Sequence, residues 1–258
     1  MEAGKRIQDL SVVRYESLNR RHFLIELEAP EPLPVMLPGQ FVQALVEDSP
    51  SVFLRRPFSI HTVDYKKNTI TLLIQIKGPG TQRLGNLREG KSLNLIYPLG
   101  NAFSIPDSDR VLLVGGGCGV APLLFLAQFL HQRKIRPDIL VGFRNKEEVS
   151  ETEIYAQYGE LFITTDDGSQ GEKGLVTDHS LFQKEHLPYN KIYCCGPEAM
   201  MKAVATIAKM HRISCEVSLE NTMACGFGVC LCCTAPTDKG NERVCVEGPV
   251  FNVERLRW

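Results

Sequence analysis

The chain has 258 residues, with 29 lysines and arginines against 30 aspartates and glutamates, so its net charge at pH 7 is −1. Hydrophobic residues make up 43% of it and charged residues 23%, as in an ordinary globular protein with a sizeable core. The balanced charge argues against nucleic-acid or membrane-surface binding, and the opening MEAGKRIQDL lacks the apolar stretch of a signal peptide. We therefore expect a cytoplasmic protein without a nucleic-acid or membrane partner.

The first hundred or so residues contain short stretches rich in β-branched and aromatic residues, separated by turn residues. These predicted strands cover residues 11–17, 22–28, 39–46, 58–63, 69–77 and 92–98. Short strands at this even spacing predict a small antiparallel β-barrel, which we assign to residues 1–104.

From Arg110 onward, apolar strands alternate with stretches of helical periodicity. The strands are expected at 110–115, 137–143, 159–165, 191–196 and 214–220, and the helices at 121–133, 152–158, 177–185 and 197–212. This alternation predicts a parallel α/β sheet covered by helices on both faces, over residues 105–219. The remaining residues, 220–258, are rich in cysteine and are predicted to form a third, small domain of loops and short strands.

The apolar run at 111–130 is long enough to cross a bilayer. Glycines and Pro122 interrupt its middle, and both would break a continuous helix. We interpret the run as a buried strand, a tight turn and a buried helix.

That tight turn favours nucleotide binding, because glycines let a backbone turn sharply and approach a phosphate at the start of a helix. Its glycines are Gly115, Gly116, Gly117 and Gly119. Two more loops follow predicted strands, one with Asp166 and Asp167 and one with Cys195, Gly196 and Pro197. Ligands of such sheets bind at the carboxyl ends of the strands, where these loops gather. The alternatives are a plain turn and aspartates that only cap it.

The stretch RRPFSI places an arginine and a serine in one barrel strand. Alternation puts Arg56 and Phe58 on one face of that strand and Pro57 and Ser59 on the other. Arg56 can bind a diphosphate with two hydrogen bonds, to which Ser59, Gly80 and Thr81 can add donors. A solvated arginine beside an ordinary glycine turn is the alternative.

Four of the nine cysteines lie within MACGFGVCLCCTAP, residues 223–236. An odd number of cysteines without an export signal favours ligands or core residues over disulfides. The C-x₄-C-x₂-C…C spacing is typical of a plant-type [2Fe–2S] cluster and rests on Cys225, Cys230, Cys233 and Cys245. Zinc sites usually show paired C-x₂-C motifs instead.

Other residues of this segment follow from that assignment. Gly226 and Gly228 keep the loop thin enough for backbone N–H groups to reach the sulfurs. Cys232 has the wrong spacing for a ligand and should point away. The remaining cysteines are interpreted as small core residues: Cys118, Cys194, Cys195 and Cys215.

The motif Arg56-Pro57-Phe58-Ser59, the glycine-rich loop and Cys195-Gly196-Pro197 together resemble the ferredoxin-reductase-like flavoproteins. With the cysteine-rich end, the chain strongly resembles the electron-transfer subunits of dihydroorotate dehydrogenase B. The resemblance implies FAD in the barrel, also lined by Leu73, Ile74 and Gln75, a [2Fe–2S] cluster, and NAD as the substrate. It implies a catalytic partner subunit with FMN and the orotate site, in a heterotetramer of two copies of each. No residue set for deprotonating an organic substrate is evident, so we assign no catalytic residue.

Two alternatives remain. One is the small subunit of a ferredoxin–NADP oxidoreductase or bifurcating complex, in which Arg144 and Lys146 would accept a 2′-phosphate. The other is a non-catalytic redox carrier or sensor, which would need neither the barrel motif nor the glycine-rich loop. Four apolar residues would either contact a partner or pack within their own domain: Phe227, Val229, Leu231 and Phe251.

Overall fold

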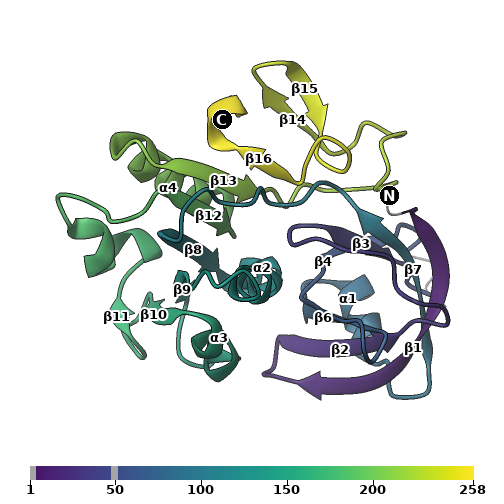
Figure 1. Ribbon diagram of the computed structural model, residues 1–258. Coiled ribbons are helices and arrows are strands. Elements are labelled where there is room, and N and C mark those ends of the chain that lie inside the picture. Colours follow the sequence, from purple (N-terminus) through teal and green to yellow (C-terminus); the bar gives the residue numbers. More distant parts are fainter. Residues whose placement is uncertain (1–3, 48–51) are drawn as a thin grey trace.

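The computed structural model describes residues 4–47 and 52–258 and contains two large sheets, with a small cysteine-rich segment at the C-terminal end (Figure 1). The first sheet has seven antiparallel strands in the order β4-β3-β7-β1-β2-β6-β5. Its strands are β1 (Arg6–Ser17), β2 (His22–Glu28), β3 (Phe41–Ala44), β4 (Arg56–Ser59), β5 (Thr62–Asp64), β6 (Thr69–Gln75) and β7 (Ser92–Leu99). Their inward-facing side chains form one apolar core, as alternating strands require.

The two edge strands of this sheet, β4 and β5, are consecutive in the chain. Between them, the Ile60 N–H donates to the Gln40 carbonyl at 3.1 Å and the His61 N–H donates to the Thr71 carbonyl at 3.0 Å. The chain therefore passes from one edge of the sheet to the other within two residues and curls the sheet into a barrel. The single strand expected at 58–63 is wrong for this reason, because the crossing divides it.

A six-residue helix, α1 (Pro79–Leu84), replaces the turn expected after β6. The Thr81 hydroxyl accepts hydrogen bonds from the N–H groups of Lys77 (2.8 Å) and Gly78 (3.1 Å). These bonds fix the start of α1, which carries Gly80, against the end of β6.

The second sheet is parallel except for its last strand and has the order β11-β10-β9-β8-β12-β13-β16. Its strands are β8 (Val111–Gly116), β9 (Asp138–Phe143), β10 (Glu160–Thr165), β11 (Glu172–Lys173), β12 (Lys191–Cys195), β13 (Ser214–Ser218) and β16 (Val250–Asn252). Strand order reverses between β8 and β12, so the loops that follow these two strands meet at a topological switch point. These are the glycine-rich loop and the loop of Cys195.

Helices cover both faces of this sheet. Helices α2 (Ala121–His131) and α3 (Thr152–Tyr158) contribute to the core on one face, and α4 (Glu198–Met210) to the core on the other. The helix expected at 177–185 is wrong: the chain forms two short 3₁₀ turns there, at Val176–Asp178 and Ser180–Gln183. Within the described residues no helix is long and apolar enough to span a membrane, since the run 111–130 divides into β8, a 3₁₀ turn and α2.

The cysteine-rich segment forms a hairpin, β14 (Thr234–Thr237) and β15 (Gly240–Arg243), and then returns to the second sheet through β16. Strand β16 pairs antiparallel with β13, which sets Phe251 opposite Val217. Phe251 is only 1% exposed, so of the two alternatives stated for it the structure shows packing within the chain and not contact with a partner. Strand β16 therefore attaches the cysteine-rich segment to the edge of the second sheet.

Candidate functional site

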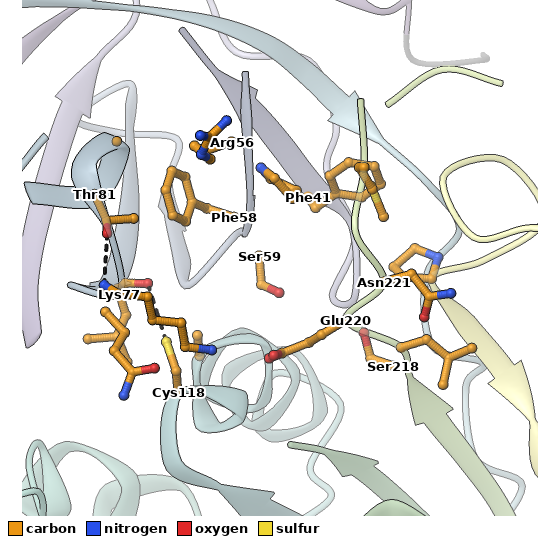
Figure 2. A pocket seen from close by; sticks show the side chains of 18 of the residues that line it. Phe41, Arg56, Phe58, Ser59, Lys77, Thr81, Cys118, Ser218, Glu220 and Asn221 are labelled. Atoms are coloured by element: carbon orange, nitrogen blue, oxygen red, sulfur yellow. Dashed lines mark hydrogen bonds between the residues drawn. The ribbon is translucent and has the colours of Figure 1, made fainter. Parts of the chain in front are cut away.

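A cavity of about 410 Å³, here called the barrel cavity, opens between the barrel and the second sheet (Figure 2). Its size is that of a typical cofactor site. Eight residues predicted from the sequence line it: Arg56, Pro57, Phe58, Ser59, Leu73, Gln75, Gly80 and Thr81. The side chain of Ile74, by contrast, is fully buried in the barrel core, as alternation along β6 requires.

Arg56 and Gly80 lie against each other at one end of this cavity. A Cβ atom at Gly80 would lie 3.1 Å from the Nε atom of Arg56, so the missing side chain leaves room for the guanidinium. One arm of the guanidinium is held by the Leu54 carbonyl, 2.7 Å from Nη1. An anchored arginine beside a glycine fits a diphosphate, which an arginine can bind with two parallel hydrogen bonds.

A second cavity of about 500 Å³, the strand-end cavity, lies at the carboxyl ends of the parallel strands. Six of the residues predicted in the nucleotide-binding loops line it: Gly116, Gly117, Gly119, Asp166, Gly196 and Pro197. A Cβ atom at Gly119 would lie 2.4 Å from the Cα atom of Gly196, so the two loops touch through their backbones. Gly117 has a φ of +53°, and a Cβ there would meet only open space, so its backbone is accessible to a ligand.

The other predicted nucleotide residues do not line this cavity. Gly115 packs on Val120 and Leu123, and Cys195 is fully buried at the end of β12, so both shape the loops from beneath. The Asp167 carboxylate accepts hydrogen bonds from the Ser169 N–H (2.9 Å) and hydroxyl (2.6 Å), which makes it a turn-forming residue here. Its neighbour Asp166 lines the cavity instead.

Four residues line both cavities and form their shared wall: Gln75, Lys77, Cys118 and Glu220. In Figure 2 the side chains of Lys77 and Glu220 extend toward each other from opposite walls of the barrel cavity. Cys118 was expected to be a plain core residue, but it faces both cavities. Burial and the nearby Glu220 raise the pKa of the Cys118 thiol to about 12, so it keeps its proton at neutral pH.

Sequence analysis missed Lys77 and Glu220. A usable signal existed, since Glu220 closely follows β13 and therefore lies at the same carboxyl edge as the predicted loops. Lys77 follows a barrel strand, and only the packing of the barrel on the sheet brings it to that edge.

The four predicted ligand cysteines form two pairs at the C-terminal end. The Cys225 thiol lies within hydrogen-bonding reach of Cys230, and the Cys245 thiol within reach of Cys233. Among the described residues, no three His, Cys, Asp or Glu side chains converge on a point that could hold one metal ion. Cys225 also acts electrostatically on Cys245, so the two pairs lie near each other. Two neighbouring pairs fit a [2Fe–2S] cluster, in which four thiolates are shared between two irons.

The surroundings of these thiols also fit the cluster. Burial opposes ionisation of Cys225, but backbone N–H groups of its own loop, led by that of Phe227, outweigh it and lower its pKa to about 6. Burial and the neighbouring Cys233 raise the pKa of Cys245 to about 12, so a thiolate there requires a cation such as iron. Cys232 is exposed and its thiol donates to the Thr222 carbonyl at 3.6 Å, outside both pairs.

The cysteine loop, residues 225–233, packs tightly at its two glycines. Gly226 and Gly228 have φ angles of +77° and +96°, a region that favours glycine. A Cβ at Gly226 would lie 2.5 Å from the side chain of Gln43, and a Cβ at Gly228 would lie 2.6 Å from Val246. The absence of side chains at these two positions thus has a second cause beyond access of N–H groups to sulfur: the loop packs closely on the barrel at Gly226 and on the C-terminal segment itself at Gly228.

Gln43 connects the cysteine loop to the barrel cavity. Its side chain is fully buried in β3, its Nε2 lies 4.0 Å from the sulfur of Met223, and Met223 lines the barrel cavity. The chain therefore brings the strand-end cavity, the barrel cavity and the paired cysteines into one continuous series.

Known proteins with a similar sequence decide the family. Residues 113–206 match the model of the oxidoreductase NAD-binding domain, and residues 220–257 match the iron–sulfur cluster binding domain of dihydroorotate dehydrogenase B. The electron transfer subunit of dihydroorotate dehydrogenase B (NAD(+)) from Caldanaerobacter subterraneus subsp. tengcongensis is 41% identical over 223 residues, which are 85% of this chain and 86% of the relative. The subunit of that name from Desulforamulus reducens is 34% identical over 98% of this chain and 99% of its own length.

The chain belongs to the family of dihydroorotate dehydrogenase B electron-transfer subunits. This confirms the resemblance found in the sequence, together with an oxidoreductase function that involves NAD and an iron–sulfur cluster.

A solved structure supports the fold of this family member. A chain of the NADH-dependent reduced ferredoxin–NADP oxidoreductase superimposes with a TM-score of 0.87 at 27% identity, covering 96% of this chain and 90% of that one. The predicted fold class is confirmed: an antiparallel barrel, a parallel α/β sheet and a C-terminal cluster-binding segment.

Proposed function

We propose that this chain passes electrons from NADH, through FAD in the barrel cavity and a [2Fe–2S] cluster on its paired cysteines, to an FMN-containing dihydroorotate dehydrogenase subunit. One observation carries the proposal: the barrel cavity shares a wall with the strand-end cavity on one side and adjoins the cysteine loop, through Met223 and Gln43, on the other. The ligands are Cys225, Cys230, Cys233 and Cys245. Flavin supplies the conversion between two-electron hydride transfer and the one-electron steps of an iron–sulfur cluster.

The chain's own residues divide the work of binding and orientation. Arg56, with Gly80 beside it, binds the diphosphate of FAD, and Ser59 and Thr81 lie on the same cavity wall. Gly117 and Gly119 offer the backbone of the glycine-rich loop to the phosphates of NADH. Cys118 holds a proton on Sγ at the shared wall, so it adds no negative charge that would disfavour reduction of a flavin in the barrel cavity.

Two side chains at the strand-end cavity bear on the choice of nucleotide. Asp166 lines the cavity, and a carboxylate accepts a hydrogen bond from a ribose 2′-hydroxyl but repels a 2′-phosphate. Arg144 also lines the cavity, whereas Lys146 does not. The backbone N–H of Lys146 donates to the Ser169 hydroxyl at 2.8 Å. A carboxylate with a single arginine supports NADH over NADPH.

A partner subunit follows from the names of the relatives, since an electron transfer subunit serves a catalytic one. We assign that partner FMN and the orotate site, with two copies of each subunit in the complex. The cytoplasm is the proposed location, because none of the nine cysteines, each within the described part of the chain, forms a disulfide.

Reconstitution tests the function. The isolated chain, loaded with FAD and iron, should oxidise NADH with an artificial dye but leave orotate unchanged. Addition of an FMN-bearing dihydroorotate dehydrogenase subunit should create NADH-linked orotate reduction. Orotate reduction by the isolated chain, or none in the reconstituted complex, would contradict the proposal.

The likeness to the NADH-dependent reduced ferredoxin–NADP oxidoreductase supports a second candidate, the small subunit of a bifurcating complex. The two candidates differ in their acceptor. Dye activity with NADPH equal to that with NADH, together with failure to couple to orotate, would favour the second candidate over the first.

A further inference from the structure

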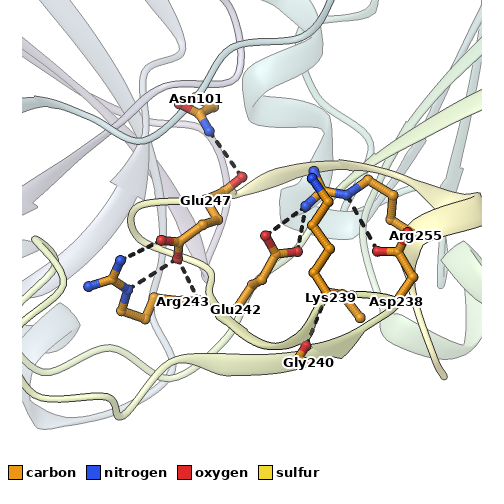
Figure 3. Close-up of polar contacts among 9 residues, drawn as sticks. Asn101, Asp238, Lys239, Gly240, Glu242, Arg243, Glu247 and Arg255 are labelled. Carbon is orange, nitrogen blue, oxygen red and sulfur yellow. Dashed lines mark hydrogen bonds and ion pairs between the residues drawn. The ribbon is translucent and has the colours of Figure 1, made fainter.

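Arg243, the last residue of β15, connects the two halves of the cysteine site. Figure 3 shows it paired with Glu247. Its Nη1 donates to the Gly228 carbonyl at 3.1 Å, within the loop that carries Cys225 and Cys230. A Cβ at Gly228 would lie 3.3 Å from the same Nη1, so the guanidinium rests directly on the loop backbone.

The other side of Arg243 is held by Glu247. The Glu247 carboxylate accepts from the Arg243 backbone N–H at 2.7 Å and from Nε at 3.2 Å, and it also pairs with Nη2. Residues 243 and 247 enclose the turn that carries Cys245. A single guanidinium thus joins the loop of the first cysteine pair to the turn of the second pair.

The charge of Arg243 also acts on the site. It lies within Coulombic reach of the sulfurs of Cys233 and Cys245. Four thiolates around two irons carry net negative charge, and an added electron increases it. A fixed positive charge nearby stabilises the reduced form more than the oxidised form, which raises the reduction potential.

We propose that Arg243 is a positioning residue of the cluster. It holds the cysteine loop against the turn that carries Cys245, and it raises the reduction potential of the cluster. Glu247 orients the guanidinium and offsets part of its charge. The proposal rests on the proposed function only in requiring that the cysteines bind a [2Fe–2S] cluster.

Arg255 offers a matched control in the same segment (Figure 3). It forms a comparable two-oxygen contact with a carboxylate, with Nη2 2.7 Å from Glu242 Oε1, and it lies 3.8 Å from Asp238. Its guanidinium stacks over Phe251, and its carboxylate partners, Glu242 and Asp238, lie outside both the cysteine loop and the turn that carries Cys245. Loss of either arginine removes one positive charge from the C-terminal segment.

The experiment is an EPR-monitored redox titration of the full chain loaded with iron and FAD, with iron content measured in parallel. Its variants are Arg243→Gln, Arg243→Lys, Glu247→Gln and Arg255→Gln. We expect Arg243→Gln to lower the cluster potential, and Glu247→Gln to raise it, because the offsetting negative charge is gone. Arg243→Lys should keep the potential near the wild-type value but lose iron faster during dialysis, since the fork between Gly228 and Glu247 is broken. Arg255→Gln should change neither quantity.

Opposite shifts for Arg243→Gln and Glu247→Gln would support the electrostatic role, and a merely structural role would not produce them. Equal shifts from Arg243→Gln and Arg255→Gln, or an unchanged potential in Glu247→Gln, would overturn the proposal. If Arg243→Gln fails to retain iron, the sign of the potential shift in Glu247→Gln still tests the electrostatic role, since a raised potential supports it and a lowered one overturns it. Wild-type chain without iron would refute the cluster itself and the proposal with it, whereas a loaded cluster that fails to couple to orotate would leave the proposal standing.

Discussion

Arg56 reaches the barrel cavity only because residue 80 has no side chain. The Leu54 carbonyl already holds one arm of its guanidinium before any ligand binds, so little side-chain entropy is lost when it binds a diphosphate. Gly226 likewise has no side chain, which lets the cysteine loop lie on Gln43.

Replacement of Arg56 by alanine should weaken FAD binding and leave the cluster in place. A charge-assisted hydrogen bond to a diphosphate contributes about 1.5–3 kcal/mol, so the dissociation constant should rise roughly 10- to 100-fold. Fluorescence titration of the flavin-free protein measures this, with Arg14→Ala on the exposed side of β1 as the control. Equal affinity for FAD in Arg56→Ala, Arg14→Ala and the wild type would mean that Arg56 is not a phosphate ligand.

Two adjacent cysteines should behave differently. Cys233→Ser should lose the cluster or alter its EPR spectrum, because Cys233 pairs with Cys245. Cys232→Ser should retain two irons per chain, because the Cys232 thiol points to the Thr222 carbonyl. Iron and sulfide analysis with EPR of the reduced protein checks both, and loss of the signal only in Cys232→Ser would reverse the ligand assignment.

The backbone of the cysteine loop is constrained at Gly226, where φ is +77° and the side chain of Gln43 leaves no room for a Cβ atom. Gly226→Ala should cost about 1–2 kcal/mol of left-handed strain and also push the new methyl group into Gln43. We expect this variant to lose most of its iron. Gly240→Ala carries similar strain at a φ of +98° but meets nothing within 4 Å, so it should be less stable yet retain its iron. Equal iron loss in the two variants would show that packing on Gln43 is unimportant.

Elements defined by local sequence could be predicted. The strands of the parallel sheet are near-continuous apolar runs, and α2, α3 and α4 have clear helical periodicity, so local pattern sufficed. The α1 helix was missed because Gly78, Pro79 and Gly80 favour a turn, and only the Thr81 hydroxyl bonds make it a helix. Strand β16 was missed because its pairing with β13 joins residues far apart in the chain, which no local pattern encodes.

At the scale of the whole molecule, the site is made by docking of three parts. Single motifs predicted Arg56, the glycine-rich loop and the cysteines, because each acts within one loop or strand. Lys77, Met223 and Gln43 could not be predicted in this way, since their roles exist only where the barrel, the sheet and the cysteine loop meet. Glu220 could have been placed at the strand ends from its position after β13, but its place in the wall of the barrel cavity also depends on this meeting.

The exposed apolar side chains of the cysteine loop bear on assembly. Phe227 is 45% exposed, Val229 74% and Leu231 62%, beside the proposed cluster. We expect Phe227→Glu to impair NADH-linked orotate reduction in the reconstituted complex far more than dye reduction by the isolated chain, because a charge would be buried at the contact. Met210→Glu at the end of α4, 74% exposed in the wild type, is the control and should change neither activity. Equal loss of both activities in Phe227→Glu would place the partner elsewhere.

On the proposed function, electrons from NADH reach the cluster through the flavin. Anaerobic titration of the isolated chain with NADH, followed by visible absorbance and by EPR of frozen samples, tests this path. We expect flavin absorbance to bleach and a [2Fe–2S] EPR signal then to appear, and we expect no such signal when FAD has been removed. Bleaching of the flavin with no cluster signal, or a cluster reduced by NADH without FAD, would contradict it.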